Sequence, residues 1–302
     1  MIRSFLFVPA DSPRKLEKSL ESTSDALIFD LEDAVSPDRK EAARQCLIAF
    51  LGARRTSIRP RVFVRVNDLR SGLTPKDLAA VMPYHPNGIV LPKSAGGEDV
   101  RTLSLYLDAF EASYSGCDKS TLILPIVTET AGSIFKMSSY KDSSSRLLGL
   151  MWGAEDLSAD LGATRSQVSG RWTDAFSLAR TLCLYAAANA GVIAIDAISA
   201  NIRSPETVRE EALEAKQDGF GAKAAIHPSQ LGPINEAFSA SASDLDWAQQ
   251  VADAFSMGAG VACLNGRMLD RPHLRLALRI LESAPAQKRD NVELPTHRKC
   301  TG

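Results

Sequence analysis

The sequence predicts a (β/α)8 barrel of the TIM type with a C-terminal helical extension. Short apolar runs, each four to eight residues long, alternate with helical stretches over the first 240 residues. Runs of this length, rich in Val, Ile, Leu or Phe, are typical of strands buried on both faces of a parallel sheet. Eight strand and helix units can be counted, and 302 residues suit one barrel with an appendage.

The eight predicted strands are residues 3–10, 26–32, 61–67, 88–93, 122–129, 146–154, 192–198 and 222–228. Ser-Pro or Thr-Pro pairs mark helix starts at residues 12, 36 and 74, because Ser and Thr are good N-caps and Pro is favoured in the first turn. A long loop with breaks at Gly162 and Gly170 follows the sixth strand. The other helices are expected from about residues 97 and 131 and over 174–191, 204–219 and 229–239.

The pattern changes near Ser241, after the eighth unit is complete. We therefore expect a catalytic barrel over residues 1–240 and an extension of helix, short extended piece and helix over 241–284. The extension either caps its own subunit or contacts a neighbouring one. Residues 285–302 have no apolar period and are expected to form a disordered tail.

Composition excludes several classes of protein. A net charge of -1 gives no long-range attraction to nucleic acid or to an anionic membrane, so neither is expected as a partner. No apolar stretch reaches the roughly 18 to 20 residues that span a bilayer, and the N-terminal apolar run is too short for a secretory signal. We expect a cytoplasmic protein.

The cysteines point to no covalent or metal framework. They are widely spaced and form no C-x-x-C pair, which argues against both disulfides and a zinc site. We expect reduced, mostly buried thiols at Cys46, Cys117, Cys183, Cys263 and Cys300.

Polar residues stand where five of the apolar runs end: Asp30, Arg65, Lys93, Glu129 and Asp156. The carboxyl ends of all strands in a barrel converge on one face, so these side chains are expected in one pocket. Glu129 and Asp156 follow the fifth and sixth strands and are suited to bind Mg²⁺, or Mn²⁺, because these ions prefer oxygen ligands. The competing interpretation is that each carboxylate only caps the helix after its strand.

Arg65 can bind a carboxylate with its planar fork or stabilise an oxyanion in the same pocket, although a buried structural salt bridge is an alternative. The nearby segment with Asp30, Glu32 and Asp33 holds too much negative charge to remain unpaired. Part of it is expected to pair with Arg65, Lys93 or metal-bound water.

Arg14, Lys15 and Lys18 lie on the first predicted helix and its loop, where they are placed either to bind phosphates or to form a solvated face. His227, before a proline, is expected to be structural. The fingerprints of nucleophile-elbow hydrolases, P-loop NTPases and Rossmann dehydrogenases are absent from the sequence.

Nine segments in register resemble the citrate lyase β-subunit-like and malyl-CoA lyase-like branch of the HpcH/HpaI aldolase family. The resemblance covers residues 2 to 284, and the segments are FLFVPADSPRKLEKSL, DALIFDLEDAV, FVRVND, GIVLPK, PIVTETAGS, WGAEDLSADLG, AIDAI, AAIHPSQ and NGRMLDRPH. It implies a Mg²⁺-dependent carbon–carbon lyase. The implied substrate is a 3-hydroxyacyl-CoA thioester, such as malyl-CoA, citramalyl-CoA or citryl-CoA, and the products are an acyl-CoA and a 2-keto acid.

The resemblance also implies roles for single residues. By position, Glu129 and Asp156 match the metal ligands, and Arg65 matches the substrate-binding arginine. Asp270 matches an aspartate that relatives deliver from a neighbouring subunit, as a proton donor or base. The positions expected to contact the CoA-type substrate, besides Arg65 and Glu129, are Phe7, Val8, Lys18, Ala225 and Ile226.

Four points stay open from the sequence. Ser12 falls where related lyases often have arginine, so part of the phosphate contact is in question. The resemblance suggests a homotrimer or homohexamer, and the acyl group is expected to be set by the loop from Leu157 to Arg171. The alternatives are a citrate lyase β subunit acting on acyl-carrier-protein-bound citryl thioester, a malyl-CoA thioesterase or malate-synthase-like activity, and an inactive barrel scaffold.

Overall fold

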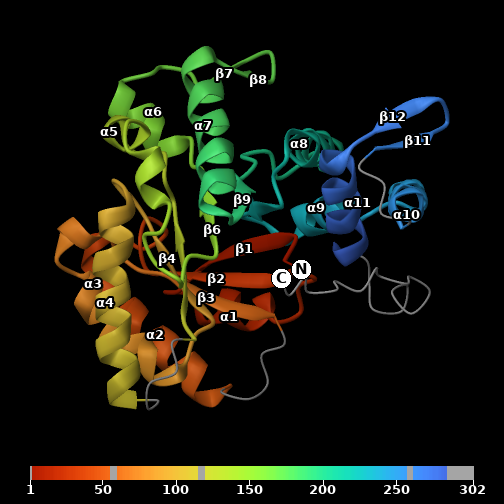
Figure 1. Cartoon of the computed structure of the whole chain (residues 1–302). Helices are drawn as coiled ribbons and strands as arrows, with labels where there is room; N and C mark the ends of the chain where they lie inside the picture. The colour runs from red at the N-terminus through yellow and green to blue at the C-terminus, as the bar shows by residue number, and fades with distance from the viewer. Residues whose placement is uncertain (1, 55–59, 115–119, 257–260, 284–302) are drawn as a thin grey trace. The chain divides into compact units, whose positions relative to one another are not determined.

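The computed structural model describes residues 2–54, 60–114, 120–256 and 261–283 (Figure 1). The chain forms two compact units. One spans Ile2–Phe238, and the other begins at Ser239.

The first unit is built on eight parallel strands, which confirms the predicted barrel. The strands are β1 (Ser4–Pro9), β2 (Ala26–Asp30), β3 (Arg61–Arg65), β4 (Gly88–Leu91), β5 (Leu122–Pro125), β6 (Gly149–Met151), β9 (Ile193–Asp196) and β10 (Ala222–Ala225). Their order in the sheet is β5-β4-β3-β2-β1-β10-β9-β6. Single bridges from Ile123 to Leu147 and from Ile126 to Met151 join the two edges. The sheet is therefore nearly closed.

Strand register aligns the ends that carry polar residues. Pro9 of β1 pairs with Asp30 of β2, and Asp30 pairs with Arg65 of β3. Because all these strands are parallel, their carboxyl ends lie at the same level of the barrel. The predicted convergence of the strand ends is observed here.

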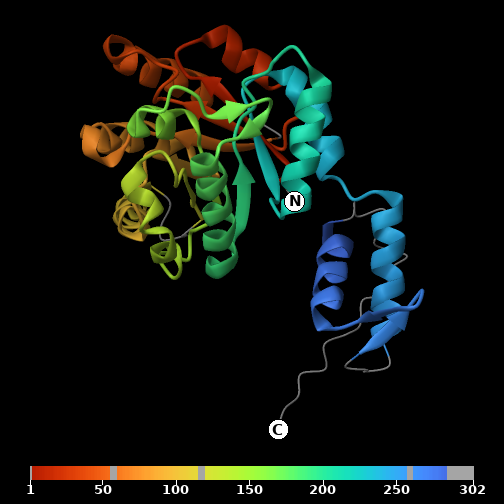
Figure 2. The same cartoon turned by 90° about the horizontal axis from the view of Figure 1, so that it is seen from above.

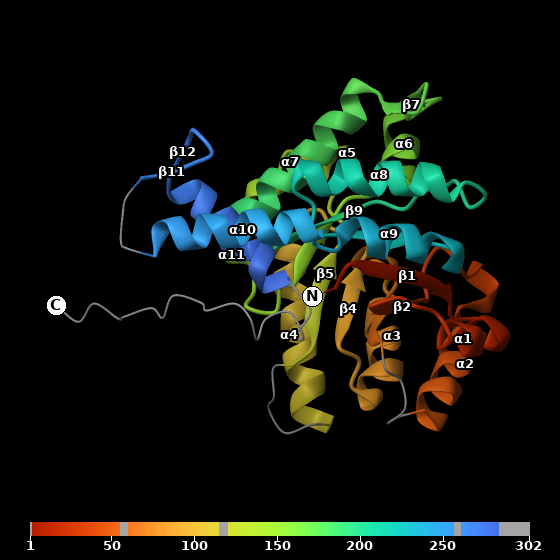
Figure 3. The same ribbon diagram turned by 90° about the vertical axis from the view of Figure 1, so that its right-hand side faces the viewer.

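Helices surround the barrel (Figures 1 and 2). They are α1 (Pro13–Ser19), α2 (Lys40–Ala53), α3 (Thr74–Val81), α4 (Gly97–Tyr114), α5 (Ala131–Ile134), α6 (Glu155–Leu161), α7 (Asp174–Ala190), α8 (Pro205–Asp218) and α9 (Leu231–Phe238). Short 3₁₀ turns are η1 (Pro37–Arg39), η2 (Leu69–Ser71), η3 (Met82–Tyr84), η4 (Met137–Tyr140) and η5 (Pro228–Gln230). Consecutive helices α8 and α9 pack side by side (Figure 3).

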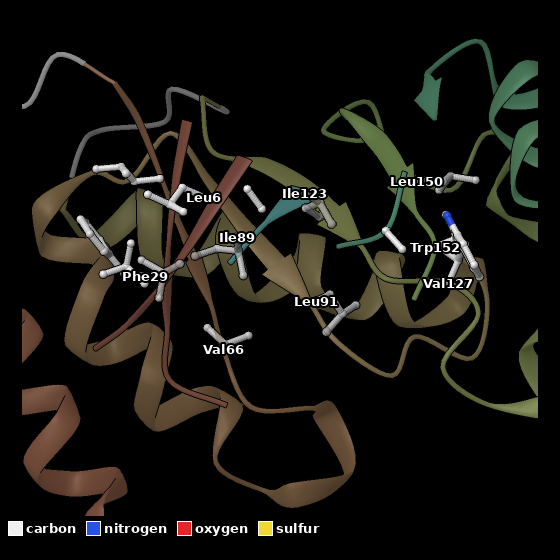
Figure 4. Close-up of a cluster of buried hydrophobic side chains, with 14 of the residues drawn as sticks. Leu6, Phe29, Val66, Ile89, Leu91, Ile123, Val127, Leu150 and Trp152 are labelled. Carbon is white, nitrogen blue, oxygen red and sulfur yellow. The ribbon is translucent and has the colours of Figure 1, made fainter. Parts of the chain in front are cut away.

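Alternation along the strands divides the apolar core into two layers. Phe5, Ile28 and Phe63 point into the barrel, where Phe5 and Phe63 meet edge to face at 5.6 Å. Leu27 and Phe29 point the other way and pack under the helices. Figure 4 shows part of this outer layer. Strands with apolar residues on both faces read as continuous apolar runs, which is why they were visible in the sequence.

The long loop predicted after β6 was wrong in part. It contains α6 and a small antiparallel hairpin of β7 (Gln167–Val168) and β8 (Arg171–Trp172). Ser169 and Gly170 turn the hairpin with φ of 49° and 78°. A two-residue turn of type I′ needs positive φ at both positions. Strands of two residues are too short to show an alternating pattern in the sequence.

The C-terminal unit packs α10 (Ala242–Phe255) against α11 (Arg271–Ser283), which are the two blue helices of Figure 2. The single extended piece predicted between them is a hairpin of β11 (Ala262–Leu264) and β12 (Arg267–Leu269). Asn265 and Gly266 form its turn. The unit has a core of its own, made of Ala248, Val251, Ala252, Phe255, Leu269, Ala277 and Leu281. The tail predicted over 285–302 lies outside the described residues.

The thiols differ from the sequence expectation of mostly buried side chains. Cys183 is buried and Cys46 is partly exposed, but Cys263 is exposed because it lies on the short hairpin of the C-terminal unit. All three are free thiols. Cys117 and Cys300 lie outside the described residues. Among the helices that the structure describes, none has both the length and the apolarity needed to cross a membrane.

Candidate active site

Arg65 and Asp30 form a buried ion pair at the carboxyl ends of β2 and β3. Arg65 Nε lies 2.8 Å from Asp30 Oδ1, and Nη2 lies 2.6 Å from Oδ2, so the pair is bidentate. Arg65 Nη1 reaches Glu32 Oε2 at 3.0 Å, and the guanidinium carbon lies 4.9 Å from the centre of the Phe7 ring. Burial alone would lower the pKa of Arg65, but Asp30 and Glu32 outweigh it and raise the pKa. The guanidinium is fixed and charged.

The loop after β2 is held by backbone contacts. Asp30 accepts hydrogen bonds from the backbone N–H groups of Glu32 at 2.9 Å and Ala34 at 3.2 Å. Lys40 Nζ donates to the carbonyl oxygens of Leu31 and Glu32, both at 2.8 Å. These bonds fix the direction of the Glu32 and Asp33 side chains.

A buried network supports the same loop from β3. Asn67 Nδ2 donates to the Leu31 carbonyl at 3.1 Å and to Asp77 Oδ2 at 2.7 Å. Arg44 Nη1 pairs with Asp77 Oδ1 at 2.8 Å, and the Asp77 side chain is fully buried. Asn67 therefore joins the end of β3 to the loop after β2.

Lys93 connects this charged loop to the next strands. Its backbone N–H donates to Glu129 Oε2, and its ammonium forms an ion pair with Glu32. The same ammonium lies 3.3 Å from Asp33 Oδ1 and 3.5 Å from Asp156 Oδ1. The pairing expected between this acidic segment and Arg65 or Lys93 is thus present.

Glu129 and Asp156 are brought together by the ends of β5 and β6. Thr128 Oγ1 donates to the Gly153 carbonyl at 2.8 Å and accepts from the Gly153 N–H at 2.8 Å. A Cβ added to Gly153 would stand 3.3 Å from Glu129 Cγ, which leaves little room for any larger residue. Asp156 lies in the first turn of α6, while Thr130 rather than Glu129 caps α5.

The electrostatics of these carboxylates are unusual. Burial raises the pKa of Glu129 to about 8, and the Asp156 charge adds to the shift, while the Lys93 N–H opposes it. Burial also raises the pKa of Glu32 to about 7, against the effects of Arg65 and Lys93. Burial is the main cause of both shifts, and repulsion between neighbouring carboxylates adds to it. We call the side chains of Asp30, Glu32, Asp33, Arg65, Lys93, Glu129 and Asp156 the mouth cluster.

All members of the mouth cluster except Glu32 and Lys93 line a cavity of about 400 Å³. One part of its lining is charged and includes Asp30, Asp33, Arg65, Glu129, Glu155 and Asp156. The other part is mostly apolar and includes Phe7, Pro9, Ile126, Met151, Ile198 and Ile226. Such a lining suits a cation at its charged part and an apolar group of a small ligand at the other part.

Not all of the predicted site residues meet here. Phe7, Arg65, Glu129, Asp156 and Ile226 line the cavity. The side chains of Val8 and Ala225 are instead buried in the layer between barrel and helices, and Lys18 is exposed on α1. Asp270 belongs to the C-terminal unit, where it precedes α11 and lies 2.5 Å from His273 Nδ1.

Sequence reasoning missed several lining residues. Ile126, Met151 and Ile198 belong to apolar runs, and their inward direction depends on strand register. Glu155, next to Asp156, also lines the cavity and was not predicted. The alternation of the runs is the only signal that points to them.

The oxygen donors fit a hard divalent cation. Within the described parts of the chain, no group of three or more His, Cys, Asp or Glu side chains is arranged to cage a metal. Mg²⁺ commonly uses only one or two protein carboxylates and completes its octahedron with water and substrate oxygens. Glu129 and Asp156, with an excess of negative charge around them, are consistent with that kind of site.

Fold and site together define a (β/α)8-type barrel with a carboxylate-rich cavity at its carboxyl end. The HpcH/HpaI aldolase/citrate lyase family matches residues 3–228. The citrate lyase subunit beta of Haemophilus influenzae is 31% identical over 292 residues, which cover 95% of this chain and 98% of that protein. The (3S)-malyl-CoA thioesterase of Cereibacter sphaeroides is 30% identical over 291 residues, covering 94% and 95%.

Solved structures agree with this relationship. The CitE protein of Mycobacterium tuberculosis in complex with magnesium, acetoacetate and coenzyme A has a TM-score of 0.75 at 30% identity, covering 93% of this chain and 97% of that one. RipC from Yersinia pestis has a TM-score of 0.65 at 30% identity, covering 81% and 98%.

The chain belongs to the HpcH/HpaI aldolase/citrate lyase family, as the sequence motifs predicted. It is an enzyme of the carbon–carbon lyase class, of the oxo-acid-lyase type. Within the family it falls in the branch of citrate lyase β-like proteins and malyl-CoA thioesterases. Relatives in this branch have been crystallised with magnesium, and one of them with coenzyme A.

Proposed function

We propose that this protein cleaves, or forms, a 3-hydroxyacyl-CoA thioester such as malyl-CoA, citramalyl-CoA or citryl-CoA, with Mg²⁺ as its cofactor. The products of cleavage are an acyl-CoA and a 2-keto acid. The observation that carries the proposal is that Arg65, Glu129 and Asp156 meet around one cavity with an apolar wall. A substrate carboxylate and hydroxyl suit the charged part, and an acyl thioester suits the apolar part.

Glu129 and Asp156 are the proposed ligands of the metal. Bound there, Mg²⁺ would supply a Lewis acid for the hydroxyl and carboxylate oxygens of the substrate. The two carboxylates reach the cavity from adjacent strand ends and leave most coordination positions to water or substrate oxygens. Mn²⁺ meets the same requirements and is expected to substitute.

Arg65 is the proposed partner of the negative charge that develops during cleavage. The bond between the carbinol carbon and the carbon next to the thioester breaks, and its electron pair forms the thioester enolate. The hydroxyl gives its proton to water and becomes a keto group. Asp30 and Glu32 hold the Arg65 guanidinium in place before the reaction. A fixed cation of this kind stabilises a developing oxyanion without reorganising.

Asp270 is the proposed acid that protonates the enolate carbon in the cleavage direction and the base in the reverse direction. The family resemblance supports this role, and we propose that Asp270 comes from a neighbouring subunit. In that case the enzyme works as a homo-oligomer, for which a trimer or hexamer is the proposed state.

We propose that the CoA part of the thioester binds beside β1 and β10. Phe7 and Ile226 line the cavity from these adjacent strands, and Lys18 is exposed on the helix that follows β1. Val8 and Ala225 would contact the substrate through their backbone, because their side chains face the helices. Lys18 would meet a phosphate as a flexible point charge.

The test is a cleavage assay with Mg²⁺ on malyl-CoA, the methylmalyl-CoA isomers, citramalyl-CoA and citryl-CoA. We expect release of a keto acid from at least one ester, with loss of activity on adding EDTA and in Asp156→Ala. Asp142→Ala, on an exposed turn, is the matched control. Activity that persists in both EDTA and Asp156→Ala would refute the metal-dependent mechanism.

Two related activities are favoured by specific likenesses. The 31% identity to a citrate lyase subunit beta supports citryl thioester on an acyl carrier protein as an alternative substrate. The 30% identity to a (3S)-malyl-CoA thioesterase supports hydrolysis of malyl-CoA. Free CoA without keto acid would indicate thioester hydrolysis, and activity only on the carrier-bound substrate would indicate the citrate lyase role.

A further inference from the structure

Lys93 has a backbone conformation that non-glycine residues rarely adopt. It follows Pro92 at the end of β4, and its φ is 50°. Left-handed backbone is strained for a residue with a Cβ and persists where the surroundings fix it. Here the Lys93 N–H donates to Glu129, and the Lys93 carbonyl accepts from Arg70 Nη1 at 3.0 Å.

The segment after Lys93 is fixed as well. The Ser94 N–H donates to the Ile126 carbonyl at 3.2 Å, and the buried Tyr140 hydroxyl lies 3.1 Å from the Ser94 carbonyl and 3.0 Å from Ser94 Oγ. The turn is thus tied to β5 and to η4. Its direction is set by these contacts and does not depend on the ammonium group.

The Lys93 ammonium is the part of the residue that crosses the mouth cluster. It pairs with Glu32, lies 3.3 Å from Asp33 Oδ1, and lies 3.5 Å from Asp156 Oδ1. Arg65, the other cation of the cluster, contacts Asp30, Glu32 and Asp33. Within the described part of the chain, the Lys93 ammonium thus links the loop after β2 to the carboxylate of α6.

We propose that Lys93 is a positioning residue that aligns both Glu129 and Asp156, the first through its backbone N–H and the second through its ammonium. The proposal rests on the proposed function, because it assigns these two carboxylates to one divalent cation. It adds a residue that touches both of them from a third strand. The left-handed turn is what lets one residue present its N–H and its side chain to the two carboxylates.

Loss of the Lys93 ammonium has opposite expected effects on cation affinity, depending on whether the ammonium acts as a counter-charge or aligns the carboxylates. Removing a positive charge from a site that binds a divalent cation would by itself tighten cation binding, because the local potential becomes more negative. If the ammonium aligns Asp156 and Glu32, its loss would let these two carboxylates move apart, and cation binding would weaken. The sign of the change therefore separates a positioning role from that of a simple counter-charge.

The experiment titrates the whole protein with Mn²⁺ alone and measures binding by calorimetry or by Mn²⁺ electron paramagnetic resonance. Lys93→Gly keeps the N–H and suits positive φ, but it lacks the ammonium. We expect its Mn²⁺ Kd to rise about 10-fold, as for loss of an outer-shell partner. We expect n-butylammonium to restore part of the affinity. Unchanged or tighter binding by Lys93→Gly would overturn the proposal.

Two further variants keep the test sharp. Lys93→Arg retains a cation and is expected to bind Mn²⁺ more tightly than Lys93→Gly. Asp142→Gly is the matched control, because Asp142 also has a positive φ of 56° and an exposed charge, and its Mn²⁺ Kd should not change. If the wild-type protein bound no Mn²⁺, the proposed function would fail. If the wild type and Lys93→Gly bound it equally, only the positioning role would fail.

Discussion

Two groups of polar and charged side chains in the barrel unit differ in their balance of charge. The mouth cluster contains five carboxylates and two cations. The second group, here called the outer cluster, consists of Asp196, Lys223, Arg180 and Trp152 between the barrel and its helices. Lys223 Nζ lies 2.6 Å from Asp196 Oδ2, and Arg180 Nε lies 3.2 Å from Oδ1.

The outer cluster pairs its buried carboxylate with two cations. Trp152 Nε1 donates to Asp196 Oδ1 at 2.7 Å, and Lys223 Nζ also donates to the Ala197 carbonyl at 2.8 Å. The more exposed Glu211 and Asp218 add further contacts to the two cations. Burial alone would raise the pKa of Asp196, but Lys223 and Arg180 lower it below its ordinary value. In the mouth cluster, the pKa values of Glu32 and Glu129 are raised instead.

The comparison teaches that burial and charge do not by themselves mark a functional site. The outer cluster is a structural ion-pair group, whereas the mouth cluster keeps an excess of acid beside a cavity. An excess of carboxylates beside a cavity is suited to binding a cation. The following predictions test this difference between the two clusters.

The largest effect is expected from Glu129→Gln. Neutralising a proposed metal ligand should lower kcat by about 10³-fold, because transition-state stabilisation of about 4 kcal/mol is lost. Thermal stability should change little or rise, because one buried carboxylate of the unbalanced cluster disappears. Steady-state cleavage kinetics and calorimetry test this, with the exposed Glu98→Gln as control. A kcat within threefold of wild type would remove Glu129 from the catalytic set.

Asp196→Ala is expected to lower stability strongly and to leave kcat nearly unchanged, the reverse of Glu129→Gln. Removing the shared partner leaves Lys223 and Arg180 with only the more exposed Glu211 and Asp218. Breaking a buried pair costs about 3–5 kcal/mol of stability. Denaturant unfolding measures the loss. The double variant Asp196→Leu with Lys223→Met should recover part of it, since the buried cation is also removed. At temperatures where Asp196→Ala stays folded, kcat should remain close to wild type, and a large fall in kcat would contradict the contrast.

Adding Mg²⁺ should stabilise the wild type through the mouth cluster alone. Ligand binding to the native state contributes about 2.7 kcal/mol when free Mg²⁺ is 100 times its Kd. Asp156→Ala should lose this response, whereas Asp196→Asn should keep it. Thermal melting with and without Mg²⁺ gives the comparison. An equal shift of melting temperature in wild type and Asp156→Ala would show that Mg²⁺ binds elsewhere.

The smallest effect concerns acid pH. The lowered pKa of Asp196 contributes stability that is fully present above its unfolded pKa of about 3.9 and is lost as pH falls through the lower folded value. The wild-type unfolding free energy should therefore fall more steeply below about pH 4 than that of Asp196→Asn. Urea unfolding at several acid pH values measures both slopes. Parallel slopes would mean that Asp196 is not preferentially stabilised in its charged form.

Much of the fold was predictable from the sequence. The barrel strands appear as apolar runs because both of their faces are buried, and the helix starts at Pro13 and Thr74 are marked by proline in the first turn. The two small hairpins were missed because strands of two or three residues carry almost no pattern. Their turns at Ser169–Gly170 and Asn265–Gly266 are the only local signs.

The candidate site was predictable in its residue types but not in its contacts. Arg65, Glu129 and Asp156 follow apolar runs, and parallel topology alone brings strand ends to one face. The path of Lys93, with its N–H on Glu129 and its ammonium near Asp156, depends on a left-handed turn that no residue pattern marks. The raised pKa values of Glu32 and Glu129 likewise depend on burial, which only the packed barrel provides.

By itself, the sequence determined the barrel class, the family and the polar residues at the strand ends, because periodicity and motif order are local properties of the chain. The tertiary structure decided which of these residues face the cavity. It placed Phe7 and Ile226 at the lining and turned Val8 and Ala225 towards the helices. Neighbouring residues on a strand point to opposite faces, so only strand register in the closed sheet assigns a residue to the site or to the core.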